Sequence, residues 1–347
     1  MLKSLDIQGF RCFRQLRVEP LTQVNLFVGQ NNAGKTSLLE AAELVAIGGV
    51  EGLMRSSVRR SEQILVRSEV EEEYKEHVFD PSHLFFGHDL QLGSSFKIQG
   101  HGETESWVEC AVEHASVQET LIHTLGFRSH VTAQKKEHAR LTISPWGGVL
   151  PPPRWWPEPS PRVNFLEAES IDVSNLGQLW GDLVLTTEEE EIIRSLRIIE
   201  PLFERLAFIG ESRGALANII VRLTGNEKRL PLGNLGGGLR HLLALVLNLL
   251  SAQGGFLLVD EIDTGLHYSV MLDMWRLLVE SAKRLRIQVF ATTHSLDCVR
   301  ALGRLRRRYP EIGEAVTLHR VERDASTTVV YDADEIVVAA EGHIEVR

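Results

Sequence analysis

The chain contains few cysteines. Cys12, Cys110 and Cys298 are widely separated in the 347 residues, and no C-x-x-C pair occurs. Cysteine zinc sites need paired thiolates at short spacing, and disulfide frameworks need an even set of cysteines. The sequence therefore argues against both, and we expect three buried thiols.

Long apolar runs are also missing. No stretch approaches the roughly 18 apolar residues that a membrane-spanning helix needs. The first residues lack the apolar core that is typical of a secretory signal. We therefore expect a cytoplasmic protein with no membrane association.

Basic residues are outnumbered. The sequence has 37 Lys and Arg against 47 Asp and Glu, a formal net charge of −10. This balance argues against a protein that coats DNA over its whole surface. Two basic clusters remain, which we interpret as solvated faces, with local nucleic-acid contact as the alternative: Arg55, Arg59 and Arg60, and Arg304, Arg306, Arg307 and Arg308.

A glycine-rich stretch carries the strongest signal. Residues 29–36, GQNNAGKT, match G-x-x-x-x-G-K-[ST] at every fixed position, between a largely apolar strand predicted over 24–28 and a helix predicted over 37–47. Such a loop binds phosphate with backbone N–H groups at the positive end of a helix dipole. We predict that Lys35 contacts the β- and γ-phosphates of ATP and that Thr36 binds Mg²⁺. The predicted nucleotide-binding residues are Gly29, Asn31, Asn32, Gly34, Lys35, Thr36 and Ser37.

Two acids follow a second apolar strand. Residues 256–259, FLLV, lead directly into Asp260 and Glu261. Buried parallel strands deliver functional groups at their carboxyl ends in this way. We predict that Asp260 holds Mg²⁺ and that Glu261 is the general base for the attacking water. Together with the phosphate-binding loop, these acids predict an ATPase.

The segments between the motifs give weaker predictions. We expect helical structure over 51–80 and a helix over 187–208 that Pro201 breaks or kinks. Residues 144–161 hold seven prolines and three tryptophans, which predicts an extended surface loop.

The start of the chain resembles a known class. Residues 9–13, GFRCF, follow a short predicted strand, as at the start of RecF, SMC and OLD-type ATPases. In those families the segment lies beside the adenine. Stacking of Phe10 or Phe13 on the base and packing in the core are both open.

The stretch from Leu235 to Arg240 resembles the ABC-type signature. In that class the helix N-terminus donates N–H groups to the γ-phosphate of a nucleotide held by a second subunit, which implies roles for Gly236, Gly237 and Gly238. Gly236 stands where the signature has serine. The contact that the serine hydroxyl makes is therefore absent or supplied elsewhere, and Arg240 is a candidate to replace it.

Two later segments extend the resemblance. Residues 263–267, DTGLH, are similar to the D-loop of OLD-type ATPases, which lines the dimer seam. The strand predicted over 287–293 is followed directly by His294, which resembles the switch histidine that contacts the γ-phosphate. Gln91 and Gln99 are equal candidates for the Q-loop glutamine.

The resemblance implies an α/β P-loop NTPase, namely an ABC-type ATPase head with two lobes and an inserted α+β segment. The predicted divisions are 1–50 with the phosphate-binding loop, 51–229 with the insertion and helical lobe, and 230–347 with the signature, Asp260 and His294. We expect neither a long coiled coil nor a Toprim domain, and we interpret residues 332–334, DAD, as a solvated turn.

The resemblance also implies a function. Two subunits would sandwich two ATP molecules with Mg²⁺, and the cycle would regulate a separately encoded, nuclease-like effector in defence against phage or mobile DNA. The alternatives are a RecF-like repair ATPase that clamps DNA and an ABC transporter subunit. The altered signature and the long insertion disfavour the transporter.

Overall fold

The computed structural model describes residues 1–67, 75–103, 105–117, 120–130, 137–143, 149, 162–168, 173–209 and 218–342. The chain divides into two compact units. The first comprises Met1–Leu21, Asn31–Ser160 and Val321–Val329, and the second comprises Thr22–Gln30, Pro161–Arg320 and Val330–Arg347.

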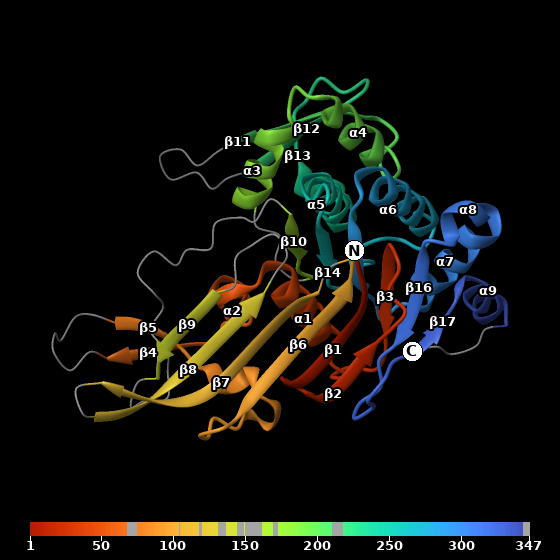
Figure 1. Ribbon diagram of the computed structural model, residues 1–347. Helices are drawn as coiled ribbons and strands as arrows, with labels where there is room; N and C mark the ends of the chain where they lie inside the picture. The colour runs from red at the N-terminus through yellow and green to blue at the C-terminus, as the bar shows by residue number, and fades with distance from the viewer. Residues whose placement is uncertain are drawn as a thin grey trace. The chain divides into compact units, whose positions relative to one another are not determined.

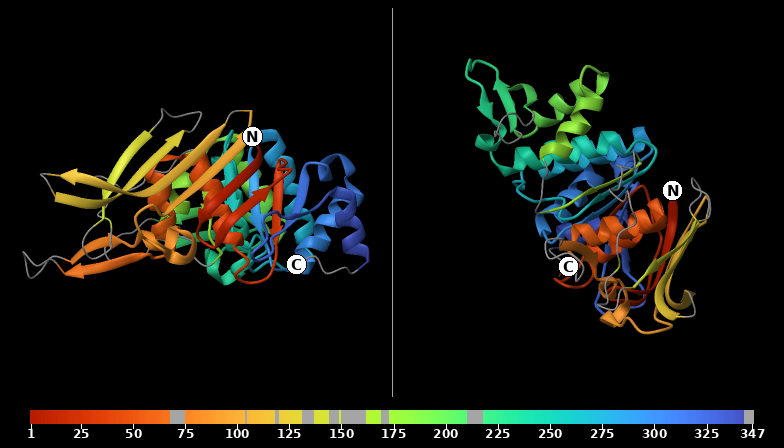
Figure 2. Two further views of the ribbon diagram at one scale, coloured as in Figure 1. Left: turned by 60° about the horizontal axis from the view of Figure 1, so that its bottom comes forward. Right: turned by 90° about the vertical axis from the view of Figure 1, so that its left-hand side faces the viewer.

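The first unit is built on a six-stranded antiparallel sheet of order β2-β1-β6-β7-β8-β9 (Figure 1). Along β6, Phe96 and Ile98 are buried while their neighbours are partly exposed, because one face of the sheet is covered. Helices α1 and α2 pack on that face, as the right-hand view of Figure 2 shows. The elements are β1 (Leu2–Phe10), β2 (Phe13–Val18), α1 (Lys35–Ile47), α2 (Gly49–Arg59), β4 (Gln63–Arg67), β5 (Lys75–Phe79), the 3₁₀ turns η1 (Pro81–Leu84) and η2 (Phe86–His88), β6 (Ser95–Gly102), β7 (Ser106–Val117), β8 (Thr120–His130) and β9 (Glu137–Thr142).

The second unit contains a six-stranded sheet of order β10-β14-β15-β3-β16-β17 (Figure 1). Pairing from β10 to β16 is parallel throughout. Every residue of β3 and β15 is buried, as is typical of parallel strands with helices on both faces. The elements are β3 (Val24–Val28), β10 (Val163–Leu166), α5 (Gly237–Ser251), β14 (Phe256–Val259), α6 (Met271–Leu285), β15 (Gln288–Thr292), α7 (Leu296–Arg308), α8 (Pro310–Gly313), β16 (Val316–Arg320), β17 (Val329–Tyr331) and α9 (Ala333–Glu341).

A smaller antiparallel sheet completes the second unit. Its order is β11-β12-β13, and its buried residues Phe203, Ile219 and Val221 join the core that also holds α3, α4 and α5. The elements are α3 (Val173–Leu183), α4 (Thr187–Leu196), β11 (Phe203–Ile209), β12 (Asn218–Leu223), β13 (Leu230–Pro231) and the 3₁₀ turn η3 (Leu232–Leu235).

Three local predictions are wrong. The helix expected over 187–208 ends at Leu196, before Pro201, and residues 203–209 form a strand. Residues 51–80 are helical only as far as Arg59 and then form the β4–β5 pair. The expected turn at 332–334 is the start of α9, where Asp332 and Glu335 form a capping box. The loop predicted over 144–161 lies outside the described residues except for Val149.

Candidate nucleotide site

Three of the predicted motifs leave one edge of the parallel sheet. Strands β3, β14 and β15 run parallel and end at Val28, Val259 and Thr292. Because parallel strands present their carboxyl ends at the same edge, the start of the glycine-rich loop, the Asp260–Glu261 pair and the segment holding His294 all begin there. Ligands of open α/β sheets bind at this edge.

The glycine-rich loop has the backbone that phosphate binding requires. Gly29, Asn32 and Gly34 have φ values of 150°, 61° and 99°. A side chain at Gly34 would also collide with its neighbours, since an added Cβ would lie 2.5 Å from the Phe13 ring and 2.6 Å from Cys12 Sγ. Only glycine fits this position.

Helix α1 begins directly after Gly34. Its N-terminus has no side-chain cap and no acidic residue in the first turn, an arrangement that suits an anionic ligand. Lys35 and Ser37 are each 6% exposed, Thr36 is half-buried, and Asn31 and Asn32 are exposed. The Lys35 ammonium, the Thr36 and Ser37 hydroxyls and the backbone N–H groups are donors that fit the phosphates of a nucleoside triphosphate.

The hydroxyl of Ser37 faces an ion-pair network. Arg60 donates to Ser37 Oγ at 3.2 Å and lies 2.7 Å from Glu40 Oε1. Glu40 is fully buried, and its other oxygen lies 2.6 Å from Arg11 Nε. The network therefore joins α1 to α2 and to the turn between β1 and β2. The sequence motifs gave no signal for Glu40.

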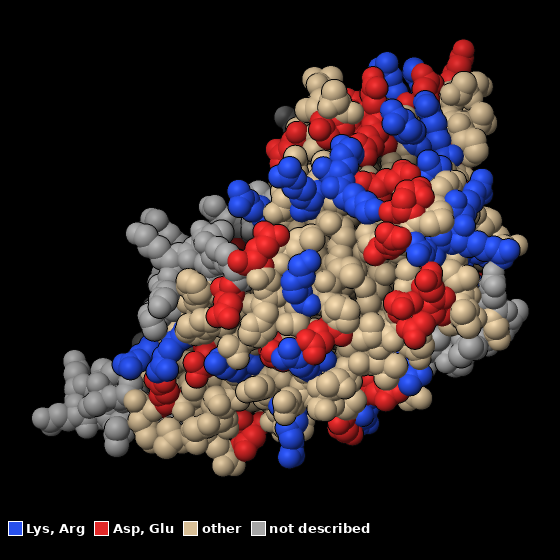
Figure 3. Space-filling view, turned by 45° about the vertical axis from the view of Figure 1, so that its right-hand side comes forward, with Lys and Arg blue, Asp and Glu red and all other residues tan. Residues whose placement is uncertain are grey.

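The basic clusters predicted as solvated faces are partly structural. Arg59 is mostly buried against Glu43 at 2.7 Å, and burial raises the pKa of Glu43 although Arg59 opposes the rise. Arg306 pairs with Glu314 and Asp334. Acidic and basic residues are interspersed over the face in Figure 3, which therefore has no field of a single sign.

Thr292 connects the two acids that follow β14. Its hydroxyl donates to Asp260 Oδ1 at 2.5 Å and accepts from the Glu261 backbone N–H at 2.8 Å. Glu261 has a φ of 51°, a conformation that costs free energy for a residue with a Cβ. One buried side chain thus fixes the carboxylate of Asp260 and the backbone of Glu261. An oxygen ligand of this kind fits Mg²⁺.

The D-loop segment is held from two sides. Thr293 Oγ1 donates to Asp263 Oδ1 at 2.5 Å, and His241 of α5 contacts the Ile262 carbonyl at 3.1 Å. Burial lowers the pKa of His241, and because a carbonyl oxygen can only accept, Nε2–H is the donor in this contact. A Cβ at Gly238 would lie 2.5 Å from the Gly265 carbonyl oxygen, so α5 approaches the D-loop directly.

The remaining predicted residues are accessible. Gly236, with φ of 93°, and Gly237 are exposed at the start of α5, and beyond their neighbours along the chain no atom of the described residues lies within 4 Å of a Cβ built on either. Arg240 is exposed one turn further on, and His294 is half-buried after β15.

The aromatic and cysteine predictions near the loop have mixed outcomes. Phe10 is a core residue, fully buried with its ring 5.2 Å from that of Phe96, and Phe13 is 5% exposed against Gly34.

Cys110 and Cys298 are buried as expected. Cys12 is exposed, although partial burial raises its pKa.

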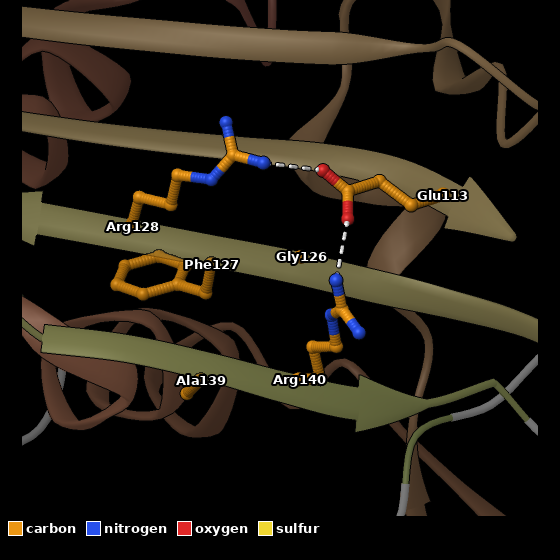
Figure 4. Close-up of a pocket in the computed structure, with 6 residues that line it drawn as sticks. All are labelled: Glu113, Gly126, Phe127, Arg128, Ala139 and Arg140. Carbon is orange, nitrogen blue, oxygen red and sulfur yellow. Dashed lines mark hydrogen bonds and ion pairs between the residues drawn. The ribbon is translucent and has the colours of Figure 1, made fainter. Parts of the chain in front are cut away.

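A separate pocket of about 510 Å³ lies on the sheet of the first unit (Figure 4). Glu113 projects over Gly126 between two arginines, at 2.9 Å from Arg128 and 3.9 Å from Arg140. None of the predicted nucleotide-site residues lines it.

Two family models match the sequence. Residues 128–298 match “AAA domain, putative AbiEii toxin, Type IV TA system”, and residues 1–52 match “AAA ATPase domain”. An ATP/GTP phosphatase of Helicobacter pylori is 21% identical over 348 residues, covering 88% of this chain and 89% of that protein. The DNA replication and repair protein RecF of Thioalkalivibrio sulfidiphilus is 46% identical over 48 residues, which are 14% of this chain and 13% of that protein.

The fold agrees with these matches. An SMC head crystallised with the C-winged helix domain of ScpA has a TM-score of 0.55 and 14% identity, over 96% of this chain and 99% of that one. The sequence matches and the fold together support an ABC-type ATPase head similar to those of RecF and SMC proteins. The predicted fold class and ATPase activity are confirmed. No helix among the described residues is long and apolar enough to cross a membrane.

Proposed function

We propose that ATP binding brings two copies of this chain together and that hydrolysis releases them. The observation that carries the proposal is the start of α5. Gly236 and Gly237 are exposed there, and Gly238 packs directly on Gly265 of the D-loop. Two segments that line the dimer seam in ABC-type ATPases are thus joined into one surface.

The predicted residues have distinct roles in this proposal. Lys35 binds the β- and γ-phosphates, and the N–H groups of the loop from Gly29 to Ser37 surround the phosphate oxygens. Thr36 and Asp260 would hold Mg²⁺, and the ion would supply positive charge beside the phosphates. Glu261 accepts the proton of the attacking water, and His294 contacts the γ-phosphate.

The glycines Gly236, Gly237 and Gly238 face the nucleotide of the second copy in the proposed dimer. A nucleotide bound across two subunits stabilises only the associated state, so association follows ATP occupancy. The division of the chain at residues 50 and 229, and its cytoplasmic location, stay predictions.

Light-scattering mass measurement tests the dimer. Loss of a general base typically slows a reaction by about 10²–10⁴-fold, so Glu261→Gln should accumulate an ATP-bound dimer with Mg²⁺. Lys35→Ala is the control, since it should remain monomeric with ATP. A monomeric Glu261→Gln variant at saturating ATP would contradict the proposal.

The biological role that we propose is control of a separately encoded, nuclease-like effector in defence against phage or mobile DNA. The toxin–antitoxin description of the model that matches residues 128–298 supports it. Co-expression with proteins encoded beside the chain, followed by purification of the complex with and without ATP, tests it. Failure of every neighbour to bind would count against this role.

A RecF-like clamp on DNA is the second candidate, supported by the RecF match over 48 residues. Phosphate contacts give a log–log salt dependence with a slope of about −0.9 per contact. A slope near zero, or no binding at low salt, would remove this candidate.

A further inference from the structure

Two histidines face each other in the segment between β5 and β6, far in sequence from every predicted nucleotide-site motif. His83 Nδ1 and His88 Nδ1 are 3.3 Å apart, and the two rings meet edge to face at 75° with centroids 5.0 Å apart. Both side chains are exposed and therefore accessible to an ion from solvent.

The separation of the two nitrogens matches metal ligation. Zn–N bonds of about 2.0–2.1 Å at a tetrahedral angle place two imidazole nitrogens about 3.3–3.4 Å apart. A direct hydrogen bond between the rings has a similar length, so the distance alone does not decide between them. The surroundings of the pair do.

Asp80 lies behind His83 in the way that a carboxylate supports a metal-bound histidine. Its Oδ2 is 3.5 Å from His83 Nε2, while its Oδ1 accepts from the Ser82 backbone N–H at 2.9 Å and caps η1. With the carboxylate on the Nε2 side of the ring, Nδ1 is the nitrogen that faces His88. Metal-ligating histidines are oriented by such partners.

The backbone turns His88 toward His83 at a cost. Gly87 and His88 have φ values of 75° and 58°, and a non-glycine residue in this region persists only where its surroundings impose it. Between the histidines, Leu84 and Phe85 are buried, and Leu84 O accepts from the Arg11 backbone N–H. The loop is therefore anchored, and the two rings are preorganised.

We propose that His83 and His88 bind a divalent transition-metal ion such as Zn²⁺, with Asp80 orienting His83. Imidazole nitrogens suit zinc, copper and nickel, whereas Mg²⁺ prefers oxygen ligands. Among the described residues there is no group of three or more His, Cys, Asp and Glu side chains that could hold a metal ion, so water would complete the coordination. The site is distinct from the Mg²⁺ predicted to accompany ATP.

Calorimetric titration of the tag-free full chain with ZnCl₂, without nucleotide, tests the site. We expect one saturable site. His83→Asn and His88→Asn should each weaken it more than tenfold, and Asn tolerates the left-handed backbone of residue 88. Asp80→Asn keeps the cap on η1 and should weaken binding by about 10–100-fold.

His114→Asn, which removes an exposed histidine of β7, is the matched control and should leave zinc affinity unchanged. Thermal unfolding with and without ZnCl₂ reports whether each variant is folded and gives a second readout through the shift of its midpoint. Absence of saturable binding up to about 1 mM Zn²⁺, or equal affinity in wild type and His88→Asn, would overturn the proposal.

Discussion

Thr292 offers the sharpest test of how the site is built. It is fully buried, and its single hydroxyl serves the Asp260 carboxylate at 2.5 Å and the Glu261 backbone N–H at 2.8 Å. Thr292→Val removes that oxygen and keeps the branched shape that suits a strand. The substitution therefore isolates two hydrogen bonds from the packing around them.

The magnitude follows from the two partners. A hydrogen bond to a charged group contributes about 1.5–3 kcal/mol, and a buried N–H left without an acceptor costs about 1–3 kcal/mol. Because Asp260 and Glu261 are only partly buried, water offsets part of this loss. We expect Thr292→Val to lower the free energy of unfolding by about 2–3 kcal/mol. If Asp260 holds Mg²⁺ as proposed, ATP hydrolysis should fall by about 10–100-fold.

Urea unfolding and steady-state ATP hydrolysis measure the two effects. Thr292→Ser is the control, because it keeps the hydroxyl and loses one methyl group, at a cost of about 1 kcal/mol. The serine variant should retain most of the ATPase rate. If valine and serine at this position gave equal stability and equal rates, the hydroxyl would not have the role that the geometry assigns to it.

Three further predictions concern buried contacts. Gly238→Ala should cost about 1–3 kcal/mol in urea unfolding and abolish ATP-dependent association in light scattering, because its Cβ would lie 2.5 Å from Gly265 O. Gly237→Ala should leave the free energy of unfolding unchanged, because its Cβ would meet no described atom within 4 Å. Burial lowers the pKa of His241, so below about pH 6.5 the unfolded chain binds more protons than the folded chain, and stability should decrease as the pH is lowered. In His241→Gln the urea midpoint should depend less on pH between pH 7.5 and 5. An unchanged pH dependence of the midpoint would refute this. Glu40→Gln should lower stability by about 1.5–3 kcal/mol, because buried Arg11 keeps only Glu62 as an ion-pair partner and Arg60, which is 35% exposed, loses its pairing with Glu40; a loss below about 1 kcal/mol would contradict this.

The strands and helices of the ATPase core could be predicted because their patterns are local. The run 24–28 is apolar except at Asn25 and is the fully buried strand β3, and 256–259 is strand β14 at the expected bounds. The glycine-rich loop was identifiable because its backbone angles allow few residue types, which fixes the sequence.

The prediction of a helix over 187–208 shows where local pattern is insufficient. Its apolar residues suit a helix, and Pro201 was expected to break or kink it, but the helix already ends at Leu196. The residues after the break form β11 because they pair with β12, a non-local contact that periodicity does not report. The same applies to β4 and β5, which pair with each other after α2 ends.

The contacts within the candidate site could not be predicted from the motifs either. Glu40 appears in the sequence as an ordinary polar residue of a helix, yet it is fully buried between Arg11 and Arg60. Thr292 was recognised only as part of a strand end. Which partner a buried polar group finds depends on how distant segments meet, and that is a property of the folded chain.

The two threonines at the end of β15 have a consequence for communication within the second unit. Neighbouring residues of an extended chain point in opposite directions, so Thr292 reaches Asp260 while Thr293 reaches Asp263 of the D-loop. A displacement of this strand end changes both contacts together. Coupling of this kind is reciprocal in binding free energy. A partner that binds and stabilises the D-loop should therefore raise the affinity for any ligand held by Asp260. That ligand should raise the affinity for the partner by the same factor.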